Sequence, residues 1–201
     1  MTTITLPKIS LMLLILFLAS PSVYPQRRQK KEQRSFATET PIARPIKLPK
    51  SVIELLLLPE EKGGAGLKGC LDEEPDISEH VSASSIDMNG DGAKDIIVQA
   101  ESKCAGLHAH GTTWWVFSNV GARFGRRSKS GYDLIFSDAG DFFAVLNTRS
   151  YGFRDLSMTQ MVAAGLKLYE TIYKFDGQKY QPRICTLRNY GKKPVRISCG
   201  Q

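Results

Sequence analysis

Four short side chains that carry oxygen donors recur at or near alternate positions of one segment. They are Asp87, Asn89, Asp91 and Asp95. Gly92 lies among them and allows the chain to bend. Calcium prefers six to eight oxygen ligands supplied by a flexible loop. The pattern therefore predicts a calcium site formed by these four side chains and the main-chain carbonyl of Ala93.

The segment lacks the bidentate glutamate of an EF-hand. Counted from Asp87, that glutamate would stand at Val98, which belongs to an apolar run. We therefore expect a strand after the loop, and weak calcium binding of about 10⁻⁴–10⁻³ M, as in extracellular modules. The alternative is a metal-free hairpin turn, because Asn89-Gly90 and Asp91-Gly92 are both turn signals.

The pattern D-x-N-x-D-G-x-x-D, followed at once by Ile96-Ile97-Val98, resembles the calcium loop of FG-GAP/VCBS repeats. These repeats occur in secreted and cell-surface β-proteins, where the short acidic and amide side chains bind calcium. The resemblance implies the same role for the donors between Asp87 and Asp95. Such repeats normally form many blades of a propeller, and 201 residues are too few for that.

A degenerate second copy can be aligned about sixty residues later. Gly92–Asp95 aligns with Gly152–Asp155. The positions of Asp87, Asn89 and Asp91 are then taken by Asn147, Arg149 and Tyr151. The second loop has lost its anionic ligands, so we expect no metal there, and Arg149 could place its guanidinium where a cation would lie. The alternative is a chance similarity between two hairpins, because Gly-x-x-Asp is a weak pattern.

Alternation of apolar and polar residues predicts a mainly β fold, an antiparallel sheet of two degenerate blade-like repeats with one short N-terminal helix. The expected strands lie near residues 80–87, 95–101, 112–118, 132–137, 142–148, 155–162, 166–175 and 183–188. Turns are expected at 89–92, 138–141, 163–165 and 176–177. The helix is expected over Val52–Leu58, between a capping box of Ser51 and Glu54 and the helix breaker Pro59.

The N-terminal residues have the pattern of an export signal. Residues 1–22 combine Lys8, the apolar run Ile9–Ala19 and small residues around Pro21. This pattern predicts a secreted or periplasmic protein whose signal peptide is removed. An uncleaved membrane anchor is the alternative.

The next segment is basic and rich in proline. Residues 26–50 hold eight Lys or Arg and two Glu, a net charge of +6, whereas residues 51–201 balance at zero. We therefore expect a disordered linker over 23–50, followed by the β domain over 51–201. A weak contact with an anionic surface through residues 26–50 is one role for this charge. We do not expect nucleic acid as a partner of an exported protein.

Four cysteines in an exported chain predict two disulfides. They are Cys70, Cys104, Cys185 and Cys199, and chain order favours the pairs 70–104 and 185–199 among three connectivities. The alternative is a zinc-dependent hydrolase that uses Cys104, His108 and His110, with Cys70 or His80 as a further ligand. The spacing lacks the paired C-x₂-C of common zinc sites.

Other signatures of catalysis are missing from the sequence. It has no G-x-S-x-G, no H-E-x-x-H and no Walker loop. Gly64–Gly69 matches G-x-G-x-x-G, but it neither follows a buried strand nor opens a helix. We therefore expect an exported binding or structural module with a protein or glycan ligand, rather than an enzyme. A periplasmic enzyme inhibitor is a further alternative.

Trp114 and Trp115 are neighbours in an expected strand, so their rings should point to opposite faces of the sheet. One ring is expected in the core. The other should pack under the N-terminal helix or form an exposed surface for a sugar or peptide.

Overall fold

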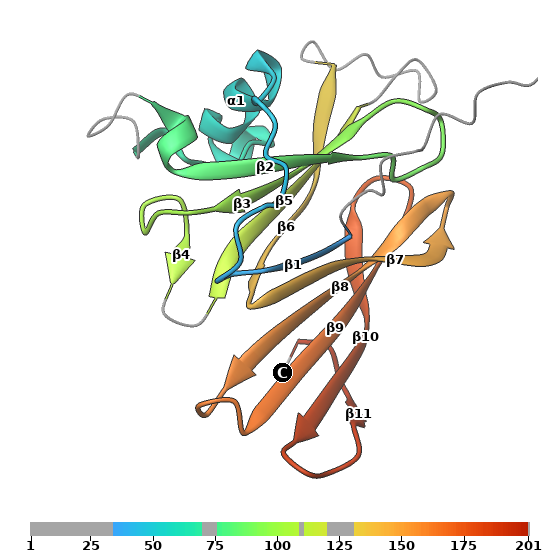
Figure 1. The fold of residues 1–201 in the computed structure, drawn as a ribbon. Coiled ribbons are helices and arrows are strands. Elements are labelled where there is room, and N and C mark those ends of the chain that lie inside the picture. The colour runs from blue at the N-terminus through green and yellow to red at the C-terminus, as the bar shows by residue number, and fades with distance from the viewer. Residues whose placement is uncertain (1–33, 70–75, 109–110, 120–130, 201) are drawn as a thin grey trace, which may run out of the picture. The chain divides into compact units, whose positions relative to one another are not determined.

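The computed structural model describes residues 34–69, 76–108, 111–119 and 131–200 (Figure 1). All of them belong to one compact unit, Glu32–Gln201. The expected signal peptide lies outside the described residues, as does the first part of the expected linker, residues 23–33. In the described part of the chain, no helix is long and apolar enough to cross a membrane.

A five-stranded antiparallel sheet forms the middle of the domain. It contains β2 (Val81–Ile86), β3 (Asp95–Ala100), β4 (Leu107–His108), β5 (Gly111–Asn119) and β6 (Tyr132–Gly140). The order is β2-β3-β5-β4, and β6 also pairs with β5. All six residues of β3 are buried, because both faces of this sheet are covered.

A six-stranded antiparallel sheet packs against one face of the five-stranded sheet. It contains β1 (Ser35–Ala37), β7 (Phe142–Ser150), β8 (Phe153–Val162), β9 (Lys167–Phe175), β10 (Tyr180–Asn189) and β11 (Val195–Ile197), in the order β1-β7-β8-β9-β10-β11. In each sheet four strands pair side by side in the order of the chain: β2-β3-β5-β6, which omits the two-residue strand β4, and β7-β8-β9-β10. The described residues confirm the mainly β fold with one short α-helix. The internal repeat stays a prediction.

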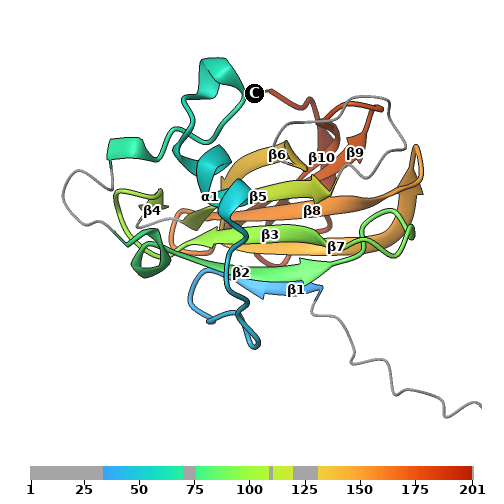
Figure 2. The same ribbon diagram turned by 90° about the horizontal axis from the view of Figure 1, so that it is seen from above.

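Two separate cores lie on the two faces of the five-stranded sheet. The core between the sheets is rich in aromatic rings, among them Phe36, Trp114, Phe136 and Phe143. The second core lies under α1 (Lys50–Leu57) and the 3₁₀ helix Ile77–Glu79, whereas the 3₁₀ helix Glu60–Lys62 contributes no buried residue. Figure 2 looks onto this side of the sheet, with α1 in front of the strands. Trp115 belongs to the second core, so the two tryptophans do point to opposite faces, and both are buried.

The segment before the helix differs from the expected disordered linker wherever the structure describes it. In residues 34–50, β1 pairs with β7, and Phe36, Ile42 and Leu48 are buried. The prediction of a linker rested on the basic and proline-rich composition of the segment, in which these few apolar side chains had little weight. The folded domain therefore begins before Ser51.

The start of α1 also differs from the expected capping box. The helix begins at Lys50, Pro49 takes the N-cap position, and no side chain caps it. The Pro49 carbonyl accepts hydrogen bonds from the main-chain N–H groups of Val52 and Ile53. Proline suits this position because it lacks an N–H group and has a fixed φ angle.

Candidate functional site

The predicted calcium loop connects β2, at the edge of the five-stranded sheet, to the central strand β3. Gly90 and Gly92 have φ angles of 81° and 85°, a left-handed conformation that other residues rarely adopt. The chain can therefore reverse within the loop while Asp87, Asn89 and Asp91 remain close to one another. All three are half-buried.

Side-chain oxygens of this loop accept hydrogen bonds from main-chain N–H groups of the same loop. The two carboxylate oxygens of Asp87 accept hydrogen bonds from the N–H groups of Gly90 (2.6 Å) and Gly92 (3.1 Å). Asp91 Oδ1 accepts one from Ala93 N–H at 2.7 Å. These are the local turns that Asp and Asn side chains commonly form.

Asn89 joins the same network through both the oxygen and the nitrogen of its side-chain amide. Its Oδ1 accepts a hydrogen bond from Asp91 N–H at 3.0 Å, and its Nδ2 donates one to Asp91 Oδ2 at 2.9 Å. A carboxylate oxygen carries two lone pairs, so one hydrogen bond does not exhaust its capacity as an acceptor. The structure thus brings three of the four predicted side-chain ligands into one network. Ala93 joins it through its amide.

Asp95 lies in a different network below the loop and is only 1% exposed. Its Oδ2 accepts a hydrogen bond from Met88 N–H, while Oδ1 accepts from Ser118 O–H and Asn119 N–H, at 2.8–3.0 Å. Burial, together with the negative charge of Asp91, raises the pKa of Asp95 to about 6 although the three donors oppose this. In this structure Asp95 therefore ties the loop to β5.

Asp155, which aligns with Asp95 in the proposed second copy, is also 1% exposed. It accepts a hydrogen bond from the hydroxyl of Ser150 at 2.7 Å. Both aligned aspartates are therefore buried carboxylates beside a hairpin turn. The shared Gly-x-x-Asp pattern has a structural explanation that needs no metal.

Arg149 reaches the first loop from the end of β7, next to the turn between β7 and β8. Its Nη1 donates hydrogen bonds to the carbonyls of Met88 (3.2 Å) and Gly152 (2.5 Å). A methyl group placed on Gly90 would lie 3.6 Å from Nη2. From the sequence, this guanidinium is expected only in the second, degenerate loop. In the structure it also lies beside the first loop, which carries the acidic residues. Its positive charge therefore lies beside a loop that carries the acidic residues Asp87 and Asp91.

The predicted zinc ligands are only partly described. Cys104 is disulfide-bonded, so its sulfur is not available as a thiolate. Its sulfur lies 3.4 Å from His80 Nδ1. His108 ends β4, while Cys70 and His110 lie outside the described residues. Within the described ranges, no three His, Cys, Asp or Glu side chains are grouped so that they could hold a metal ion.

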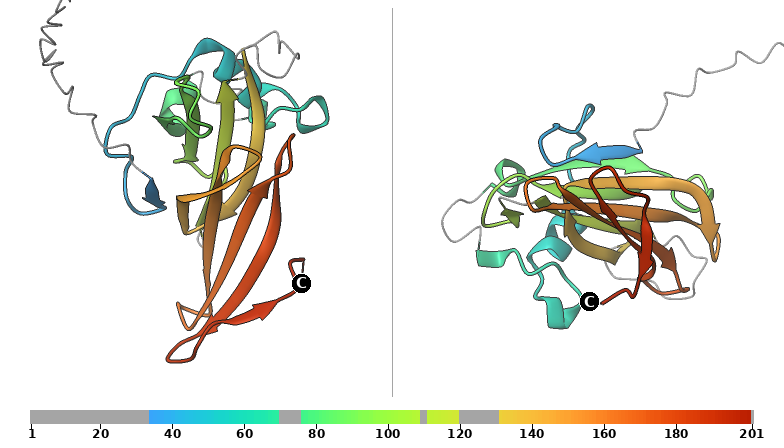
Figure 3. Two further views of the ribbon diagram at one scale, coloured as in Figure 1. Left: turned by 90° about the vertical axis from the view of Figure 1, so that its right-hand side faces the viewer. Right: turned by 90° about the horizontal axis from the view of Figure 1, so that it is seen from below.

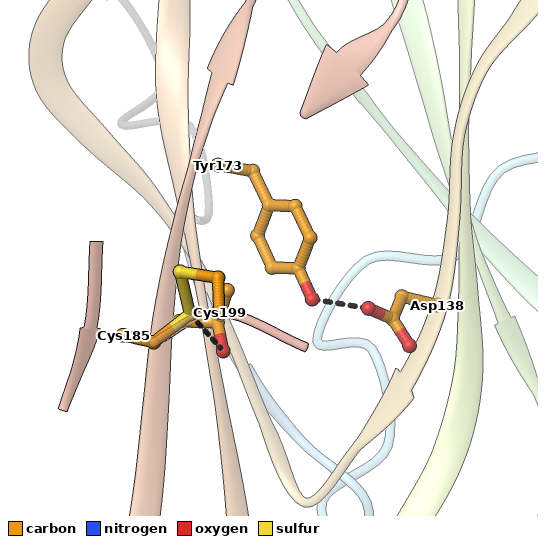
Figure 4. The surroundings of a disulfide bond; sticks show 5 residues. Asp138, Tyr173, Cys185 and Cys199 are labelled. Atoms are coloured by element: carbon orange, nitrogen blue, oxygen red, sulfur yellow. Dashed lines mark hydrogen bonds between the residues drawn. A yellow bond between two sulfur atoms is a disulfide. The ribbon is translucent and has the colours of Figure 1, made fainter. Parts of the chain in front are cut away.

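Cys185 and Cys199 form the second disulfide that chain order favoured (Figure 4). It links β10 to the residues after β11, a three-residue strand that pairs with β10. The described residues contain no free cysteine.

A cavity of about 740 Å³ opens where β1, the start of β7 and the β3–β4 connection meet. Its lining includes Thr38, Glu39, Lys103, Leu107, Phe142 and Met161. The volume is in the range of small-molecule sites, about 300–1,000 Å³. These residues come from distant parts of the chain and form no motif, so sequence reasoning missed the cavity.

Comparison of the chain with known protein families, curated proteins and solved structures finds no match.

Proposed function

We propose that this protein is an exported binding or structural module, with a protein or glycan ligand, whose β2–β3 loop is stabilised by calcium. The observation that carries the proposal is the network of Asp87, Asn89 and Asp91. Three side chains with oxygen donors are held within one glycine-containing turn, and each is accessible to solvent.

Calcium would act on this loop through electrostatics. Asp87 and Asp91 carry like charges in a short turn, and a divalent cation between them cancels their repulsion. Because the ligands converge only in the folded chain, calcium stabilises the native state. At ten times the dissociation constant, the gain in unfolding free energy is about 1.4 kcal/mol.

Export is supported by the signal-like pattern at residues 1–22 and by the disulfide chemistry of the domain. Disulfides persist in oxidising compartments outside the cytosol. Free calcium at the millimolar level, which a weak site requires, is typical of the same environment. The cavity beside Phe142 offers an aromatic ring, hydroxyls and charged groups to a ligand of the proposed class.

Calorimetry with calcium and with EDTA tests the proposal. We expect millimolar calcium to raise the Tm of the unmodified protein by about 3–6 °C. Asp91→Ala should abolish this response. Asp176→Ala is the matched control, because Asp176 forms a similar turn with Gln178 and Lys179 between β9 and β10. This variant should keep the calcium response.

Magnesium at the same concentration controls for ionic strength. A Tm of the unmodified protein that is the same in calcium and in EDTA would show that the loop is only a hairpin turn.

A further inference from the structure

The tip of the β8–β9 hairpin is apolar and exposed. It has the sequence Met161-Val-Ala-Ala-Gly-Leu166, which contains no polar side chain, and Leu166 is 58% exposed. Ala163 and Ala164 have positive φ angles of 52° and 53°, which non-glycine residues seldom adopt. Runs of exposed apolar residues disfavour solubility unless they serve a function.

A second hairpin tip lies beside the first. The main-chain N–H of Tyr190, in the turn between β10 and β11, donates a hydrogen bond to the carbonyl of Leu166 at 2.8 Å. Tyr190 is 84% exposed. Figure 1 shows both turns at the same end of the six-stranded sheet. Leu166 and Tyr190 therefore belong to one surface.

Exposed cations surround these two tips. They are Lys167, Arg188, Lys192, Lys193 and Arg196. Lys167 pairs with Asn189 and Arg188 pairs with Leu168, so both lie at the tip end of the sheet. From Lys167 to the C-terminus the chain has eight basic and two acidic residues, whereas residues 51–166 have ten basic and sixteen acidic residues. The positive charge is thus concentrated on β9 to β11.

This end of the six-stranded sheet extends beyond the core between the sheets. The core residues of β8 are Phe153, Leu156 and Met158, and those of β9 are Tyr173 and Phe175, so the last four residues of β8 and the first six of β9 contribute none. Figure 3 shows the tip ends of these strands extending away from the five-stranded sheet. The Cys185–Cys199 disulfide fixes this projecting part.

We propose that the tip surface, formed by residues 161–166, Tyr190 and the five surrounding cations, docks on anionic phospholipid bilayers. The apolar tip would enter the boundary between headgroups and acyl chains while Tyr190 lies at the interface. The lysines and arginines would contact the anionic headgroups. A symmetric contact with a second copy is disfavoured, because it would bring ten cations together. The proposal does not depend on calcium binding by the β2–β3 loop.

Co-sedimentation of the full chain with vesicles tests the charge requirement. The vesicles contain 70% phosphatidylcholine and 30% phosphatidylglycerol, or phosphatidylcholine alone. We expect binding only to the anionic vesicles, and about 30-fold weaker binding for Lys192→Gln/Lys193→Gln, because each cation near the surface contributes about fivefold. Lys174→Gln/Lys179→Gln is the matched control, since it removes the same charge near the opposite end of β9 and in the turn that follows, and it should bind like the unmodified protein.

Two further variants test insertion of the apolar tip. Leu166→Ser/Tyr190→Ser changes only exposed side chains and should weaken binding at least tenfold with an unchanged Tm. Both native tryptophans are buried, so Leu166→Trp adds an exposed reporter whose emission should shift to the blue on anionic vesicles. The measurements are made in EDTA and in calcium, so that failure of the calcium proposal does not affect them.

Several results would overturn the docking proposal. One is equal loss of binding in the two lysine pairs, which would indicate attraction by net charge alone. Another is unchanged binding of Leu166→Ser/Tyr190→Ser, which would place the contact elsewhere, for example on the basic residues 26–50. A third is concentration-dependent self-association that these two substitutions abolish, which would assign the surface to a second copy. Absence of vesicle binding by the unmodified chain would also refute it.

Discussion

The hydroxyl of Tyr173 in β9 donates a hydrogen bond to the carboxylate of Asp138 in β6 and so connects the two sheets (Figure 4). Burial raises the pKa of Tyr173 above its usual value, and the hydrogen bond and negative charge of Asp138 raise it further. In the unfolded chain a tyrosine ionises near pH 10. The unfolded state therefore loses this proton first, and stability falls as the pH rises above about 10.

We expect Tyr173→Phe to lower the unfolding free energy at pH 8 by about 1 kcal/mol, because one hydrogen bond is lost. The same variant should lose less stability than the unmodified protein between pH 9 and pH 11. Urea unfolding at these pH values measures both effects. Tyr151→Phe, at a largely exposed tyrosine, is the control and should behave like the unmodified protein. Equal alkaline losses in Tyr173→Phe and the unmodified protein would contradict this account.

Removal of the Arg149 guanidinium should have opposite effects on stability and on calcium affinity. Arg149→Gln loses the hydrogen bonds to Met88 and Gly152, so we expect the calcium-free protein to lose about 1–2 kcal/mol. Calcium should bind several-fold more tightly, because a positive charge beside the loop is gone. Calcium titration by calorimetry, with Arg183→Gln as the exposed control, measures this. Weaker calcium binding in Arg149→Gln would show that the guanidinium does not oppose the cation.

The N-terminal strand should be essential to the fold. Phe36 is buried, and its ring centroid lies 5.8 Å from that of Trp114 and 5.9 Å from that of Phe143. We expect Phe36→Ala to lower the unfolding free energy by about 3–5 kcal/mol. Ser35→Ala changes an exposed position of the same strand and should cost little. A Phe36→Ala variant as stable as the unmodified protein would restore the view of residues 34–50 as a linker.

Alternation was sufficient to predict the long strands. Each of the eight expected strands overlaps a strand among the described residues. Six of them have nine or ten residues, which is long enough for a clear period of two, whereas β2 and β3 have six. The strands β1, β4 and β11 have three residues or fewer, too few for any period. They form because a neighbouring strand offers hydrogen-bond partners. The sequence of the short strand itself does not show which strand will be its neighbour.

The sequence also predicts only part of the candidate site. Spacing alone identified Asp87, Asn89 and Asp91, because their hydrogen bonds stay within the loop. The role of Asp95 depends on Ser118 and Asn119 in another strand, and the approach of Arg149 depends on how the sheets pack. Neither relationship has a signal in the local sequence.

Loss of the Cys185–Cys199 disulfide should loosen the projecting part of the six-stranded sheet. The bond closes a loop with a sequence separation of 14, for which the expected contribution is about 3 kcal/mol. We expect faster amide hydrogen exchange in β10 and β11 of Cys185→Ser/Cys199→Ser. The buried strand β3 is the internal control, and its exchange should change little. Titration of the unmodified protein under denaturing, non-reducing conditions should find no free thiol.

The adjacent tryptophans provide a way to observe the two cores separately. Trp114 lies between the sheets and Trp115 lies under the helical layer, and the chain has no other tryptophan. Replacing either ring by phenylalanine leaves a single fluorophore that reports on one core. If the two single-tryptophan proteins unfold at the same denaturant concentration, the helical layer and the sandwich form one cooperative unit. If the midpoints differ, the helical layer detaches first and the domain has a partly folded state.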